Sequence, residues 1–297
     1  MARVSGLPSA FTLLGRGLQL WRRQPVLWKV LLWFIAVPSI VIHIGARLAT
    51  VTQEGVELTL DTVMTATPSE MYALPWIALL FFSMWAVCCT LLLGRRLLGN
   101  PAGRGRESFR TLAHQGQRWI LPIILCALIR EIITILLLLP LLIGSFLLLW
   151  KFQLLPSSPD EITSVLMLPQ YMVNALVKGA GSVNAALLLA GLVLLAIPSI
   201  VFRIRTTFYD IALVGEKLGC RKSLRRSSAV VRSRFFGVFF RVVLMTVCVA
   251  APIILLFLAM HLAALPSILR GIVNDILEGA AMMLLTLSSA ALFKHLR

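Results

Sequence analysis

Acidic and histidine residues are scarce in this chain. Its 297 residues include 12 aspartates and glutamates and 4 histidines, against 28 lysines and arginines, and only 13% of the residues are charged. The histidines lie far apart, so no clustered acid, base or metal ligands point to hydrolysis or metal binding. Nucleophile elbows, phosphate-binding loops and dinucleotide fingerprints are also missing. We therefore expect no enzyme, no cofactor and no metal site.

Cysteines are few and carry no motif. The five cysteines have neither a CxxC spacing nor a Cys/His ligand spacing, which gives no support to a zinc site or a disulfide framework. A cleavable signal peptide is not expected either, because the first apolar run begins only after Arg22 and Arg23.

Apolar residues are abundant instead. They make up 59% of the chain, whereas an ordinary soluble domain has roughly 45–50% apolar and about 25% charged residues. A soluble fold of this length could not bury so much apolar surface. The composition therefore indicates a membrane protein.

The apolar residues gather into long runs. A run of about 18 or more residues is long enough for a helix to cross the ~30 Å hydrocarbon core. The chain has six, at about 26–46, 73–93, 122–150, 183–202, 237–262 and 274–293. We expect an all-α polytopic protein in which six transmembrane helices form a single membrane domain over residues 1–297.

The charges predict an orientation. With both termini inside, most of the 28 cations fall in cytoplasmic segments and most of the acids fall outside, as the positive-inside rule requires. This predicts a multi-pass protein of a bacterial-type inner (plasma) membrane. The net charge of +16 lies in short loops, none long enough for a nucleic-acid-binding module. Anionic lipid headgroups are thus the expected partner; a protein partner or a homo-oligomer stays open.

Three short segments precede spans and are expected to form amphipathic interfacial helices, at about 9–22, 105–117 and 216–235. In the first, Phe11 and Trp21 have the same spacing as Phe109 and Trp119 in the second. Two interpretations stay open: three repeated helical hairpins, or coincidence, since aromatic residues commonly mark the membrane interface.

The segment 216–235 divides into two faces at 100° per residue. Small and apolar side chains fall on one face and cations on the other. Small residues favour close helix packing, so we expect this helix to dock on the bundle rather than to act as a free lipid sensor, with its cations toward anionic headgroups. The residues assigned to this site are Arg221, Lys222, Leu224, Arg225, Arg226, Ser227, Ser228 and Arg232.

Arg130 and Glu131 are the ionisable pair deepest in an apolar run. A charge within the membrane is costly and is a functional hypothesis by default. Adjacent helix residues do not face one another, so each is expected to need another partner. The alternative is that the span begins near Ile132 and that Arg130 extends to the interface.

The second half of the chain carries several short motifs. They are Ala196-Ile197-Pro198, Phe202-Arg203, Ala212-Leu213-Val214-Gly215-Glu216, Lys222-Ser223-Leu224-Arg225-Arg226-Ser227 and the final Phe293-Lys294. With them, residues 183–297 resemble the membrane domain of some glycerophosphodiester phosphodiesterases and its stand-alone relatives; the first half is similar in topology. The resemblance implies a six-helix bundle without catalysis, because hydrolysis in those proteins belongs to a separate soluble domain.

Two functions follow from these observations. The first is a scaffold or accessory factor in lipid or envelope processes, without catalytic machinery. The alternative is a small transporter or channel that uses Arg130 and Glu131 in a polar cavity. A membrane-embedded lipid enzyme is the third hypothesis, and the chain lacks the clustered acid, base or metal ligands that it would need.

Overall fold

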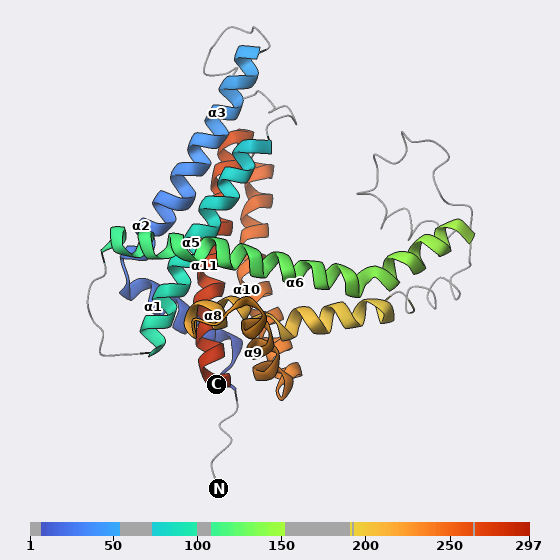
Figure 1. Ribbon diagram of the computed structural model, residues 1–297. Coiled ribbons are helices and arrows are strands. Elements are labelled where there is room, and N and C mark those ends of the chain that lie inside the picture. Colours follow the sequence, from blue (N-terminus) through green and yellow to red (C-terminus); the bar gives the residue numbers. More distant parts are fainter. Residues whose placement is uncertain (1–6, 54–72, 100–107, 152–190, 192, 264) are drawn as a thin grey trace. The chain divides into compact units, whose positions relative to one another are not determined.

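The computed structural model describes residues 7–53, 73–99, 108–151, 191, 193–263 and 265–297, and all regular structure within them is helical (Figure 1). A helix without a label covers residues 193–205. The labelled helices are α1 (Ala10–Arg23), α2 (Val26–Leu31), the π-helical η1 (Leu32–Ala36), α3 (Val37–Gln53), α5 (Ala73–Gly99), α6 (Phe109–Lys151), α8 (Tyr209–Gly215), α9 (Cys220–Arg232), α10 (Phe235–Leu262) and α11 (Ser267–Leu296).

Within the described residues, five helical segments are long and apolar enough to cross a membrane. They are Val26–Thr52, Ile77–Arg95, Phe109–Gly144, Phe235–Leu262 and Ser267–Leu296, and they correspond to five of the six predicted runs. The structure is therefore compatible with a multi-pass membrane protein. Residues 183–190 and 192 of the sixth run, 183–202, lie outside the described residues, and residues 193–202 belong to the helix over 193–205.

The sequence of α1 accounts for both its start and its amphipathic character. The hydroxyl of Ser9 accepts a hydrogen bond from the backbone N–H of Thr12 and caps the helix start. Its buried residues follow helical spacing and pack against α11 and α10; they are Ala10, Leu13, Leu14, Gly17 and Trp21. The helix ends before Pro25, because the residue that precedes a proline avoids the α conformation.

The first span contains a local change of helix type. The π-helical segment η1 ends just before Pro38, which has no N–H to donate to the carbonyl of Phe34 and whose ring crowds that carbonyl. A π-helical turn is one way in which a helix accommodates such an interruption. It turns Ile35, which is 2% exposed, toward Gly279 of α11.

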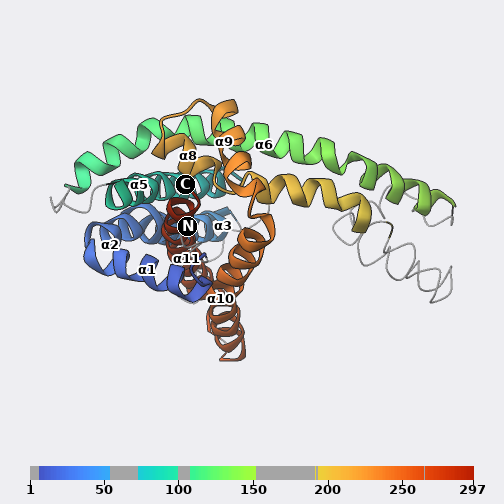
Figure 2. The same cartoon turned by 90° about the horizontal axis from the view of Figure 1, so that it is seen from below.

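The larger of two compact units, here called the main unit, comprises Met1–Cys126 and Thr207–Arg297. Within it, α11 contacts α1, α3, α5 and α10 (Figure 2). Two of these contacts are close because a glycine lies at the crossing point. A Cβ on Gly279 would lie 2.7 Å from Cγ2 of Ile35, and one on Gly17 would lie 2.5 Å from the hydroxyl of Ser288. Glycine at these positions lets the helix axes approach.

The second unit, Ala127–Thr206, is called the hairpin unit. Its two described helical parts, the end of α6 and the helix over 193–205, run antiparallel and side by side (Figures 1 and 2). Glu131 lies beside Arg203 at one end, and Gly144 lies beside Leu195 toward the other.

One predicted interfacial helix needs correction. The segment 105–117 is no separate helix within the described residues, because α6 runs uninterrupted from Phe109 to Lys151. No turn residues separate the segment from the span that was expected at 122–150. Pro122 alone removes a single backbone hydrogen bond, which a long helix tolerates. The segment 9–22 coincides with α1 to within one residue at each end, and the segment 216–235 contains α9.

The threefold repeat is not confirmed. In its first expected copy a turn at Gln24-Pro25 separates the short helix from the span, and in the third a turn at Ser233-Arg234 does so. The second copy has no such turn. Phe11, one of the residues on which the repeat was based, is 68% exposed, so it does not share the buried position of Trp21.

We predict that Gly279→Ala destabilises the protein by about 1–3 kcal/mol, because the new methyl group meets the branched side chain of buried Ile35. Gly45→Ala is the matched control: it also lies in a span helix, and nothing lies within 4 Å of its Cβ position. Unfolding midpoints in detergent titrations measure both. Equal midpoints for the two variants would contradict the close contact.

Candidate functional site

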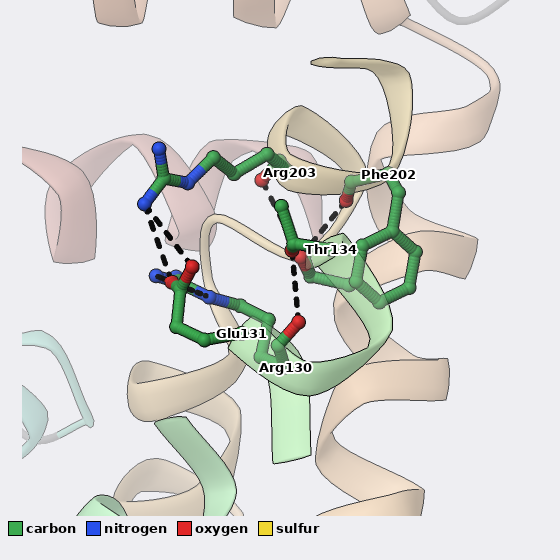
Figure 3. Close-up of polar contacts among 6 residues, drawn as sticks. Arg130, Glu131, Thr134, Phe202 and Arg203 are labelled. Carbon is green, nitrogen blue, oxygen red and sulfur yellow. Dashed lines mark hydrogen bonds and ion pairs between the residues drawn. The ribbon is translucent and has the colours of Figure 1, made fainter. Parts of the chain in front are cut away.

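The ionisable pair that the sequence singled out, Arg130 and Glu131, belongs to a three-residue charge cluster in the hairpin unit (Figure 3). The Nε atom of Arg130 lies 3.2 Å from Oε1 of Glu131, and Nη2 of Arg203 lies 3.3 Å from each oxygen of the same carboxylate. The prediction that adjacent residues do not face each other was wrong for Arg130, since its long side chain folds back onto its neighbour. Arg203 supplies the additional partner that was expected for Glu131.

Hydroxyl groups complete the surroundings of the charge cluster. Thr134 donates to the carbonyl of Arg130 at 2.8 Å, and Thr206 donates to that of Phe202 at 2.8 Å. The Glu131 side chain is 38% exposed. One carboxylate between two guanidinium groups leaves a net charge of +1, an arrangement that links α6 to the helix over 193–205.

Helix α9, in the main unit, places its small residues inward. Leu224 and Ser227 from the predicted site are buried, whereas Ser228 is half-buried. Ser223 and Val231 are buried as well. The predicted cations lie on the other side: Arg226 is half-buried, and the exposed ones, called the basic face of α9, are Arg221, Lys222, Arg225 and Arg232.

Specific contacts hold α9 in place. The hydroxyl of Ser227 accepts a hydrogen bond from the backbone N–H of Phe208 at 3.0 Å, and Phe208 packs on Phe293 of α11. Nε of Arg226 lies 3.1 Å from the carboxylate of Glu216, which also meets Arg297 at 3.6 Å. A larger residue at position 227 would separate α9 from the helix start at Phe208, which explains why a serine lies there.

Two thiols lie near the N-terminal end of α9: Cys220 of α9 itself and Cys126 of α6. The thiol of Cys126 lies 3.5 Å from the hydroxyl of Ser223, and that hydroxyl donates to the carbonyl of Cys220 at 2.7 Å. Burial raises the pKa of Cys220 to about 12, and its hydrogen bond with Cys126 adds to the shift. Cys220 therefore stays a thiol at neutral pH and is a poor nucleophile.

A second polar arrangement, between α3 and α11, was missed in the sequence. The hydroxyl of Ser39 donates to Oδ2 of Asp275 at 2.7 Å, and Nε2 of His43 lies 3.0 Å from the same oxygen. One turn further, Arg47 donates to the hydroxyl of Ser267 at 2.7 Å. We call these residues, with Gly271, the polar seam.

The polar seam follows a regular spacing that the sequence does contain. Ser39, His43 and Arg47 are four residues apart on α3, and Ser267, Gly271 and Asp275 are four apart on α11. Each set therefore occupies one helix face. The second set was missed because the last span was expected to begin only at residue 274. That boundary placed Asp275 at the outer end of the span, among the acids assigned to the external side.

The polar seam does not have the geometry of a hydrolase. Its serine donates to the carboxylate rather than to the imidazole, and both donors share one oxygen, so the imidazole is not placed to take the hydroxyl proton. In the part of the chain that the structure describes, no group of three or more His, Cys, Asp or Glu side chains could hold a metal ion. The seam joins two helices by buried polar contacts.

We predict that Asp275→Ala lowers stability by about 1–2 kcal/mol, because it removes the carboxylate that accepts from buried Ser39 and contacts half-buried His43. Glu278→Ala, one turn along α11, is the control; it removes an exposed carboxylate that accepts from Asn274 at 2.9 Å. Detergent unfolding of both variants measures the difference. A midpoint for Asp275→Ala equal to that of Glu278→Ala would mean that the seam contributes nothing to stability.

The basic side of α9 allows a similar comparison between neighbouring arginines. Arg226→Glu replaces a cation with a second carboxylate beside half-buried Glu216, and we expect a loss of about 1–2 kcal/mol and a lower membrane yield. Arg225→Glu changes an exposed side chain and should leave the yield near that of the wild type. Quantitative blotting of isolated membranes tests both. Identical yields would argue against docking of α9 through Glu216.

Comparisons of the chain with family models, curated proteins and solved structures find no match. The resemblance of residues 183–297 to the membrane domain of glycerophosphodiester phosphodiesterases stays a prediction based on the short motifs.

Proposed function

We propose that the protein is a multi-pass membrane scaffold or accessory factor in lipid or envelope processes, without catalytic machinery. On this proposal it lies in a bacterial-type inner membrane with both termini and the basic segments in the cytoplasm. Its working surface is the basic face of α9, which attracts anionic lipid headgroups and holds them beside the bundle.

The observation that carries the proposal is the division of α9 into a buried small face and an exposed basic face. Each cation near an anionic leaflet contributes about 1 kcal/mol, so four amount to about 4 kcal/mol before screening by salt. Because α9 is fixed by the Ser227 and Glu216 contacts, these cations are held as a set.

The orientation rests on the distribution of charge. In the proposed topology the basic face of α9 belongs to the same side as most of the 28 lysines and arginines, as the positive-inside rule favours. Anionic lipids of the cytoplasmic leaflet are the complementary surface.

Transport is the second candidate, and the charge cluster is the specific observation behind it. Ionisable residues in a span often mark a substrate path. However, Glu131 already binds both Arg130 and Arg203. This mutual pairing fits a structural link within the hairpin unit better than an open substrate site, and we therefore rank the scaffold first.

One crossed experiment separates the two candidates. Cells that lack the protein are complemented with either Arg221→Gln/Lys222→Gln/Arg225→Gln/Arg232→Gln or Glu131→Gln, and phospholipid turnover and detergent sensitivity are measured at equal protein levels. A scaffold that acts through α9 predicts that the α9 variant fails to restore the wild-type values and that Glu131→Gln restores them. Transport through the charge cluster predicts the opposite.

A charge-conserving variant serves as the matched control. Arg221→Lys/Arg225→Lys/Arg232→Lys keeps all four charges and should restore function, because headgroup attraction depends mainly on charge. Loss of function in this control at a normal protein level would show that the arginine geometry, and not the charge of the face, is required.

A further inference from the structure

A groove of about 640 Å³ opens in the main unit between α5 and the first turns of α6. Its lining is polar and basic, with Arg110, His114 and Arg118 along α6 and Trp85 on α5. The volume lies within the usual range of small-ligand sites, roughly 300–1,000 Å³. We call it the basic groove; it is separate from α9 and from the charge cluster.

Three basic side chains form a row in this groove. Arg110, His114 and Arg118 are four residues apart, so they share one face of α6, and all three are exposed. Nη2 of Arg118 lies 3.4 Å from Nε2 of His114. Among the described residues no carboxylate pairs with Arg110 or Arg118, whereas Glu131 and Glu216 each meet two arginines elsewhere. The row therefore lacks an anion within this part of the chain.

The wall opposite the row is fixed by contacts that do not use the basic side chains. The indole N–H of Trp85 donates to the carbonyl of Ala113 at 2.8 Å, and its ring stacks on Phe34 with 4.6 Å between centroids. A Cβ on Gly116 would lie 2.7 Å from the thiol of Cys89, which shows how closely α6 and α5 approach. Trp85 is half-buried, so with its N–H occupied it contributes the remaining apolar part of its ring to the groove.

The groove lies at a position along α5 where cations without a counter-ion are costly. Trp85 lies inside the apolar segment Ile77–Arg95, ten residues before its basic end, about 15 Å along a helix. Cations beside such a segment are costly without a counter-charge or water. An anion bound between the two arginines would supply the counter-charge.

We propose that the basic groove binds the phosphate group of an anionic ligand, either the headgroup of a phospholipid or a free phosphate. The planar guanidinium groups of Arg110 and Arg118 match two phosphate oxygens each. The carboxamides of Gln115 and Gln117 and the imidazole of His114 provide further polar contacts to the remainder of a headgroup. The apolar face of Trp85 suits a glycerol or acyl portion.

The experiment uses the full-length protein in nanodiscs. One arm titrates inorganic phosphate against protein in phosphatidylcholine nanodiscs by calorimetry. The other counts phosphatidylglycerol molecules retained per protein by native mass spectrometry, in nanodiscs of phosphatidylcholine with increasing phosphatidylglycerol. Saturable binding in the lipid arm alone identifies a headgroup site, and binding in both arms identifies a site for phosphate itself.

Three variants decide whether the groove is the site. Arg110→Gln/Arg118→Gln should weaken binding at least tenfold, and Arg110→Lys/Arg118→Lys should retain part of it. Arg22→Gln/Arg23→Gln, which removes two exposed cations of α1, is the matched control and should change binding less than twofold. Circular dichroism and melting confirm that each variant is folded.

Two results would overturn the proposal: no saturable binding to wild-type protein in either arm, or equal affinities for the glutamine variant and the α1 control. Equal affinities concern the groove alone, whereas the absence of retained phosphatidylglycerol would also count against headgroup binding by α9. The α9 complementation uses other residues and another readout. Likewise, failure of the α9 variant to alter cell physiology leaves the binding measurements on the groove unaffected. The two proposals can thus fail separately.

Discussion

The close approach of α11 to its neighbours is the constraint on which the main unit depends. Two glycines make it possible, because any side chain at Gly17 or Gly279 would collide with the facing helix. Once α11 and α3 are in contact, Asp275 meets Ser39 and His43 within hydrogen-bonding distance. If lipid surrounds this bundle, as its five candidate spans allow, apolar burial gives little preference for one helix partner over another. Small residues and interhelical hydrogen bonds then select the pairing.

The same helix positions the surface that we assign to function. Near its end, Phe293 packs on Phe208, whose backbone N–H binds Ser227 of α9. The terminal Arg297 approaches Glu216, which in turn holds Arg226 of α9. The orientation of the basic face therefore depends on contacts that begin in the core of the bundle. A change at Gly279 is expected to disturb α9 as well as the span itself.

Local patterns in the sequence predicted local structure well. The helical class, the apolar segments that five spans now occupy, and the short helices α1 and α9 all follow from hydrophobic spacing. Contacts between segments far apart in the sequence were harder to predict. The polar seam joins residues 39 and 275, whose pairing no local pattern fixes. Helix α6 continues through Pro122. Helix propensity alone does not decide whether a proline ends a helix. The fold-back of Arg130 depended on the length of a side chain rather than on its helical position.

The shortage of acidic residues connects composition to function. The chain has 12 acids against 28 lysines and arginines. Three carboxylates, those of Glu131, Glu216 and Asp275, each contact two other side chains. Among the described residues, the arginines of the basic groove and of the basic face of α9 are left without such a carboxylate. Unshared cations beside apolar helices need anions from outside the chain, and phospholipid phosphates are the anions present at every membrane surface. The cations that carry no carboxylate partner among the described residues are therefore the ones to which our proposals assign lipid phosphate.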